Sequence, residues 1–163
     1  MSGLLDAFGA LFLRRPPRAV HDDDETPAEK TGEARCTILA IDDDQTFLDT
    51  LRPTLRMEGF NVMTAISGTK GLDMARFTKN EVRVVLLDFQ MPRLTGLETL
   101  QHLRKLMPQA KILGLTGMPA KDLPEEFCAN VDHLMNKPYR TSELVQCINS
   151  LAGIDESAVA GKS

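Results

Sequence analysis

The chain has 163 residues, of which 42% are hydrophobic and 26% charged, so it can form one globular domain with an ordinary core. Its formal net charge of −4 and its lack of a basic stripe argue against a nucleic-acid binder. No apolar run approaches the roughly 18–20 residues of a membrane span. The three cysteines form neither a CxxC motif nor a metal-binding spacing, which favours reduced thiols and a cytoplasmic protein.

The first 35 residues differ in composition from the rest of the chain. A short apolar segment is followed by arginines and prolines and then by an acidic run over residues 21–29, which is typical of a disordered linker. A helix over residues 1–18 would carry an apolar stripe of Leu4, Leu5, Phe8, Leu11 and Phe12. This segment has three open interpretations: contact with a membrane surface, docking on a partner, or a disordered arm. Asp6 and the late arginines argue against a secretory signal.

Strand and helix patterns alternate from residue 37 onward. The apolar residues 37–41 predict a strand, and a helix is expected over 45–58 with Asp44 as its N-cap. A second strand is expected over 61–65, before a helix that starts near Ser67.

The middle of the chain contains the clearest buried strand. Residues 82–87 end in an unbroken Val/Leu run, which is typical of a strand covered on both faces. Thr95 is a candidate cap for the next helix, in which leucines recur at helical spacing from Leu97 to Leu106.

The last third repeats the alternation less regularly. We expect a strand over 111–115, a poorer helix around 120–128 that contains Pro124, and a strand over 131–136. A final helix is expected over 142–151, with its first residue as candidate cap.

Five strand–helix pairs in succession predict an α/β fold: a doubly wound five-stranded parallel sheet with helices on both faces. The expected organisation is an N-terminal arm and acidic linker over 1–35, one domain over 36–152 and a flexible tail over 153–163.

Four of the predicted strands end on residues that suit phosphate chemistry. Asp42 and Asp43 follow the first strand, Asp88 the third, Thr116 the fourth and Lys137 the fifth. In a parallel sheet these ends lie along one edge, where open α/β folds bind their ligands. Carboxylates there suit a divalent metal. A carboxylate can also act as a nucleophile, while a hydroxyl and an ammonium bind phosphoryl oxygens.

The same segments resemble the receiver domain of two-component response regulators. The resemblance covers residues 37–151, in the family's order, and implies its flavodoxin-like fold. It rests on Ile38-Leu-Ala-Ile-Asp-Asp-Asp44, Val84-Val-Leu-Leu-Asp-Phe-Gln-Met-Pro-Arg-Leu-Thr-Gly96, Leu115-Thr-Gly117 and Lys137-Pro-Tyr139.

The resemblance implies a metal-dependent phosphorylation site. Asp88 corresponds to the phosphoacceptor, and Asp43 and Asp88 would bind Mg2+ (or Mn2+) directly. Asp42 would act through water, and the backbone carbonyl of Gln90 would be a further ligand. Thr116 and Lys137 would bind the phosphoryl group, and the Lys137–Pro138 bond would be cis.

The resemblance also implies partners. The phosphoryl group would come from a histidine kinase or a histidine phosphotransfer protein. A stand-alone receiver would then signal through protein contacts or a phosphorelay, and it would be no enzyme beyond its own phosphorylation and slow dephosphorylation. A phosphorylation-linked homodimer stays open.

Four positions depart from or modulate the family pattern. Leu134 replaces the usual switch aromatic, and Asn130, which tolerates a left-handed backbone, replaces a usual glycine. Gln90 and Met118 are expected to flank the path of hydrolytic water. Two roles stay open for Met118: it shields the acyl phosphate, or it only packs against the neighbouring loop.

Two other functions stay open. A degenerate receiver would bind partners without being phosphorylated. A phosphohydrolase of the haloacid-dehalogenase type would use Asp42 as nucleophile, since residues 42–46 fit its DxDxT pattern, but it leaves Asp88 without a role.

Overall fold

The computed structural model describes residues 34–155. Nearly all of the expected arm and linker, and most of the expected tail, lie outside the described residues. The proposed contacts of residues 1–18 and the predicted domain boundaries therefore remain predictions. Within residues 34–155, no helix has both the length and the apolar character needed to cross a membrane.

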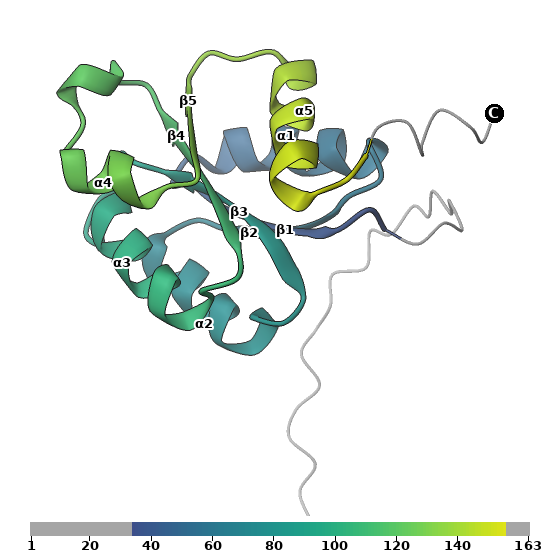
Figure 1. Ribbon diagram of the computed structural model, residues 1–163, viewed down its shortest axis with the longest axis horizontal. Coiled ribbons are helices and arrows are strands. Elements are labelled where there is room, and N and C mark those ends of the chain that lie inside the picture. Colours follow the sequence, from purple (N-terminus) through teal and green to yellow (C-terminus); the bar gives the residue numbers. More distant parts are fainter. Residues whose placement is uncertain (1–33, 156–163) are drawn as a thin grey trace, which may run out of the picture. The chain divides into compact units, whose positions relative to one another are not determined.

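The core of the fold is one parallel five-stranded sheet, as the sequence predicted, and its strand order is β2-β1-β3-β4-β5 (Figure 1). Its strands are β1 (Thr37–Ile41), β2 (Asn61–Ala65), β3 (Val82–Asp88), β4 (Lys111–Thr116) and β5 (His133–Asn136). The order changes direction at β1, whose two neighbours in the sheet are β2 and β3. Such a switch point is where doubly wound sheets open a crevice at the carboxyl ends of their strands.

Helices cover both faces of this sheet (Figure 1). They are α1 (Gln45–Met57), α2 (Gly68–Thr78), α3 (Gly96–Leu106), α4 (Glu125–Asn130) and α5 (Thr141–Ala152), with a short 3-10 turn at Ala120–Asp122. The buried apolar residues form two clusters, one holding side chains of α1 and α5 and the other those of α2, α3 and α4. In β3, Val84 and Leu86 belong to the first cluster and Val85 and Leu87 to the second, which explains the unbroken apolar run of this strand.

Side-chain caps begin three of the helices where the sequence predicted. Asp44, Ser67 and Thr95 each accept a hydrogen bond from the backbone N–H three residues later. The Glu98 carboxylate also accepts the N–H of Thr95 at 2.9 Å, which completes a capping box at α3.

The predicted Ser142 cap is wrong. Helix α5 begins one residue earlier, at Thr141, so that Ser142 lies inside its first turn. The Glu143 carboxylate instead accepts the backbone N–H of Arg140 at 3.2 Å.

The helix predicted around 120–128 is divided in two. Pro124, which lacks an N–H, separates the 3-10 turn from α4. Strand β5 begins at His133 rather than at 131, because Val131 still bonds back to α4 through its N–H and the Phe127 carbonyl. Asn130 is the last residue of α4 and is not left-handed, so it does not replace a glycine in a backbone role.

Candidate phosphorylation and metal site

The register of the sheet gathers the polar strand ends at one edge. Ile41 of β1 pairs with Leu87 of β3, so the next residues along these neighbouring strands, Asp42 and Asp88, lie side by side. Thr116 pairs with Asn136, the residue before Lys137. The loop after β5 is tied to β4 because the Lys137 N–H donates to the Thr116 carbonyl at 2.7 Å.

Three carboxylates form a cluster at this edge. Asp42 and Asp88 are buried, with 3% and 5% exposure, whereas Asp43 is exposed. Each offers a carboxylate oxygen, and these oxygens lie within 4.8 Å of one another. Oxygen ligands at this spacing, with one side open to solvent, suit a hard divalent cation that keeps part of its water shell. The donor set therefore fits Mg2+.

The ammonium of Lys137 joins the two buried carboxylates. Its Nζ lies 2.6 Å from Asp42 Oδ2 and 3.0 Å from Asp88 Oδ1. The Lys137–Pro138 bond is cis, as the resemblance implied. The side chain thus places one positive charge directly beside an oxygen of each buried carboxylate.

The charges of this cluster perturb one another. Burial and the neighbouring Asp42 charge raise the pKa of Asp88 to about 6, although Lys137 acts in the opposite direction. Burial alone would lower the pKa of Lys137, but its bonds to Asp42 and Asp88 outweigh burial and raise it. One ammonium therefore does not offset both the burial of Asp88 and its repulsion by Asp42, and an added cation would.

Two aromatic residues that sequence reasoning missed complete the surroundings of Lys137. Its Nζ lies 4.5 Å from the centroid of the Phe47 ring, and Tyr139 packs edge-on against Phe47 with centroids 6.5 Å apart. A signal for Phe47 existed in the sequence, since it lies in the first turn of the helix that follows the acidic loop. Tyr139 was part of the Lys-Pro-Tyr motif but had no assigned role.

Thr116 is fully buried at the end of β4. Its Oγ1 accepts the backbone N–H of Met118 at 2.9 Å, so the hydroxyl oxygen is engaged by its own loop. Asn136 holds the same loop through a bond from Nδ2 to the Met118 carbonyl at 3.2 Å. Among residues 34–155, the structure records no hydrogen bond between the Thr116 hydroxyl and either the Lys137 ammonium or the carboxylates.

The remaining candidate residues border the cluster. Gln90 is exposed, and its Oε1 lies 3.2 Å from the point where a Cβ on Gly117 would be. Met118 and Leu134 are half-buried and pack against the apolar cluster beneath α3 and α4. Gly96 allows the β3–α3 loop to close on the site, because a Cβ there would lie 2.6 Å from the Asp88 carbonyl oxygen.

Comparison with known proteins agrees with this arrangement. The family model described as the response regulator receiver domain matches residues 38–149. This chain belongs to the response regulator receiver domain family.

Curated relatives are similar to this receiver domain at 30% identity over 115 residues. It is 30% identical over 115 residues to the cell cycle transcriptional regulator CtrA of Caulobacter vibrioides, a match that covers 70% of this chain and 49% of CtrA. The chain thus spans about half the length of the curated relatives it matches.

Solved structures show the same fold. A receiver domain protein of Clostridium thermocellum is 30% identical, with a TM-score of 0.68 over 72% of this chain and 94% of that one. The response regulator TrrA of Thermotoga maritima, solved in complex with Mg(2+)-BeF, is also 30% identical, with a TM-score of 0.62. That match covers 71% of this chain and 98% of TrrA. Proteins of this family are signalling proteins rather than ordinary enzymes.

Proposed function

We propose that this receiver domain accepts a phosphoryl group on Asp88 in a Mg2+-dependent reaction. One observation carries the proposal: three clustered carboxylates lie beside a lysine whose Nζ is 3.0 Å from an Asp88 oxygen. An acidic pocket with one fixed ammonium provides the two kinds of charge stabilisation that phosphoryl transfer requires.

In the transfer step an Asp88 carboxylate oxygen attacks the phosphorus of the donor. A phosphorus–oxygen bond forms, and the bond from phosphorus to the donor's imidazole nitrogen breaks, with its electron pair returning to the ring. Asp88 must be ionised to attack, and its raised pKa of about 6 leaves it mostly ionised at neutral pH. Burial at the end of β3 fixes the direction of the attacking oxygen.

The other residues bind charge. Asp43 and Asp88, with the Gln90 carbonyl, would hold the metal directly and Asp42 through water. Bound Mg2+ would neutralise the carboxylates and the phosphoryl oxygens. Lys137 offers an ion pair to the phosphoryl group. Thr116 offers its hydroxyl proton, which in this structure is directed to the Met118 carbonyl at 3.4 Å.

The wider role follows from this chemistry. The donor would be a histidine kinase or a histidine phosphotransfer protein, and the output a protein contact or a phosphorelay. Mn2+ as substitute metal and a phosphorylation-linked homodimer are parts of the same proposal. The described cysteines are all unpaired, which supports a reducing, cytoplasmic location.

The test is incubation with Mg2+ and acetyl phosphate or phosphoramidate, followed by intact-mass measurement. Wild type, Asp88→Asn and Asp122→Asn are compared, the last as a matched change at an exposed aspartate. We expect one added phosphoryl group in wild type and Asp122→Asn and none in Asp88→Asn. Omission of Mg2+ should suppress the modification.

Other outcomes favour the other functions. If neither wild type nor Asp88→Asn is modified, by a small donor or by a kinase donor, the result supports a degenerate receiver. Modification of both supports a different acceptor such as Asp42, the nucleophile expected for a phosphohydrolase.

A further inference from the structure

The Lys137 ammonium has a third neighbour besides Asp42 and Asp88. The face of the Phe47 ring lies 4.5 Å from Nζ, well inside the range of a cation–π interaction. The side chain of Lys137 is 27% exposed, so that water competes only in part for this charge. The ring and the carboxylates together fix where the ammonium lies.

Phe47 is itself held in place. Its backbone N–H donates to the Asp44 cap at 3.0 Å, which anchors it in the first turn of α1. Its ring packs against the apolar cluster between α1, α5 and the sheet, with Tyr139 edge-on at an interplanar angle of 80°. The aromatic face is therefore part of a rigid helix start and not of a loop.

The ring differs from the two carboxylates in what happens to it during the reaction. Metal binding and phosphorylation change the charge and the partners of Asp42 and Asp88, on which Lys137 depends in the metal-free protein. Phe47 carries no group that binds a metal or a phosphoryl oxygen, so its contact with the ammonium persists. It is the one neighbour of the three whose attraction for Lys137 is the same before and after transfer.

We propose that Phe47 is a positioning residue for phosphoryl transfer, whose ring face keeps the Lys137 ammonium at the phosphoryl site while its carboxylate partners are engaged. This inference rests on the proposed function. It assigns the aromatic ring an electrostatic role, in addition to its packing in the apolar cluster and its place in the wall of a hollow of about 160 Å3 between α1 and α5.

Two substitutions separate these roles. Phe47→Leu preserves an apolar side chain that packs but removes the π face, whereas Phe47→Tyr preserves the face. Phe77→Leu is the matched control, since Phe77 lies on α2 and is 86% exposed. Thermal unfolding of all four proteins shows whether each is folded.

The first readout is the phosphorylation rate at saturating Mg2+ as a function of acetyl phosphate concentration. We expect Phe47→Leu to lower the maximal rate roughly 3- to 10-fold, with a smaller change in the half-saturating donor concentration. A similar loss is expected in the affinity for BeF3−, a non-reacting phosphoryl analogue. Phe47→Tyr and Phe77→Leu should stay within about twofold of wild type.

The second readout does not need the reaction. In the metal-free protein the Lys137 methylene protons next to Nζ should be shifted upfield by the ring current of Phe47. This shift should be retained in Phe47→Tyr and lost in Phe47→Leu. Equal shifts in wild type and Phe47→Leu overturn the contact itself.

The reaction readouts separate the two proposals. Suppose that wild type is phosphorylated, and that Phe47→Leu reacts equally fast or Phe47→Tyr reacts as slowly as Phe47→Leu. Either result overturns the role of Phe47 and leaves the proposed function standing. A wild type that takes up no phosphoryl group overturns the proposed function and the role of Phe47 in it.

Discussion

Gly114 of β4 and Leu134 of β5 lie opposite each other in the sheet, and Leu134 fills the space that a side chain at Gly114 would occupy. A Cβ on Gly114 would be 3.1 Å from Leu134 Cδ1 and 3.0 Å from Cε1 of Phe127, the fully buried residue of α4. The position where the resemblance implies a switch aromatic thus holds an aliphatic side chain that packs against the apolar cluster. Side chains of strand β5 and helix α4 therefore both pack closely against this one glycine.

We expect Gly114→Ala to destabilise the protein by about 1–3 kcal/mol, because the added methyl group displaces Leu134 and Phe127 together. Thermal or urea unfolding measures the change, and hydrogen exchange should show it concentrated in α4. Gly117→Ala is the control, since a Cβ there meets only the flexible end of Gln90. Equal stability of the two variants would contradict the packing described above.

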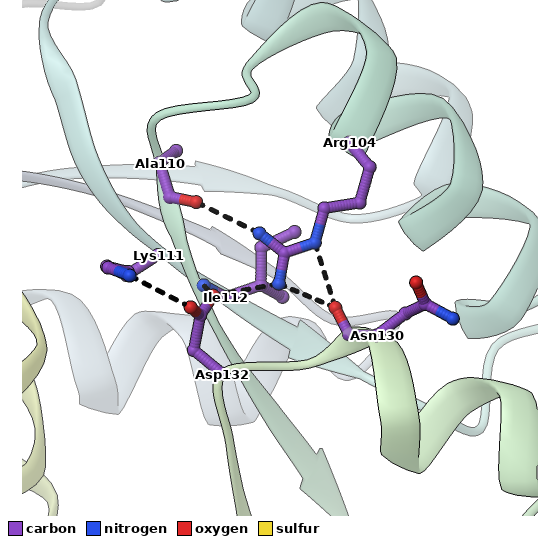
Figure 2. A network of polar contacts seen from close by, with 6 residues as sticks. All are labelled: Arg104, Ala110, Lys111, Ile112, Asn130 and Asp132. Atoms are coloured by element: carbon purple, nitrogen blue, oxygen red, sulfur yellow. Dashed lines mark hydrogen bonds and ion pairs between the residues drawn. The ribbon is translucent and has the colours of Figure 1, made fainter.

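A polar network anchors the C-terminal end of α4 (Figure 2). The Arg104 guanidinium of α3 donates to the Asn130 carbonyl at 2.8 Å and to the Asp132 carboxylate at 2.8 Å. The Asp132 carboxylate also accepts the Ile112 N–H at 2.8 Å and the Lys111 ammonium at 3.1 Å. One carboxylate therefore joins α3, β4 and the start of β5.

Removing that carboxylate charge should weaken the domain. We expect Asp132→Asn to lower the free energy of unfolding at pH 7 by about 1–3 kcal/mol, because charge-assisted bonds to Arg104 and Lys111 are lost. Asp122→Asn, at an exposed aspartate of the 3-10 turn, should change it little. Urea unfolding of both variants and wild type measures the difference.

The pH dependence of this effect has a definite sign. Burial raises the pKa of Asp132, but hydrogen bonds from Ile112, Arg104 and Lys111 outweigh it and lower the pKa below its usual value. The stabilisation is therefore present above the ordinary aspartate pKa and is lost as the pH falls through the lowered value. The gap between wild type and Asp132→Asn should shrink in acid. A gap that is constant from pH 7 to pH 3 would disagree with this assignment.

Asp88 should show the opposite behaviour. Its pKa is raised to about 6, chiefly by burial and by Asp42, so the folded metal-free protein favours the protonated carboxyl. Stability from this group is present below the unfolded-state pKa and is lost as the pH rises through about 6. At pH 8 without metal, Asp88→Asn should be more stable than wild type by about 2–3 kcal/mol.

Two measurements check why Asp88→Asn should be more stable than wild type at pH 8. The difference between Asp88→Asn and wild type should vanish near pH 4, and Mg2+ should stabilise wild type more than the variant. A variant less stable than wild type at pH 8 would show that the Lys137 bond outweighs the repulsion among the carboxylates.

Much of this site could be predicted because it depends on local sequence. The convergence of Asp42, Asp88 and Lys137 follows from where apolar runs end and from the parallel order of the strands. The Asp44 and Thr95 caps likewise depend on residues within one turn.

Other features depend on how the helices and loops are oriented relative to the sheet. The Phe47–Lys137 contact joins residues 90 positions apart and requires the rotation of α1 about its axis, which no local pattern determines. The orientation of the Thr116 hydroxyl toward the Met118 N–H depends on the conformation of one loop. The start of α5 was misplaced because Arg140 is an unusual N-cap residue, and its N–H is satisfied by Glu143.

Met118 provides the last test, on the lifetime of the phosphorylated state. It is half-buried, its backbone is held by Thr116 and Asn136, and Gln90 Oε1 lies close to the neighbouring Gly117. Because these bonds involve only the backbone of Met118, its side chain can be changed without altering the loop. We expect Met118→Ala and Met118→Glu to admit or orient water and to speed dephosphorylation several-fold.

The experiment follows the decay of the phosphorylated protein by intact mass after removal of the donor. Met118→Leu is the matched control, since it keeps the apolar cover and should decay at the wild-type rate. The phosphorylation rate of each variant distinguishes a change in water access from damage to the site. If Met118→Ala and Met118→Glu decay as slowly as wild type, the thioether only packs against its apolar neighbours and does not shield the acyl phosphate.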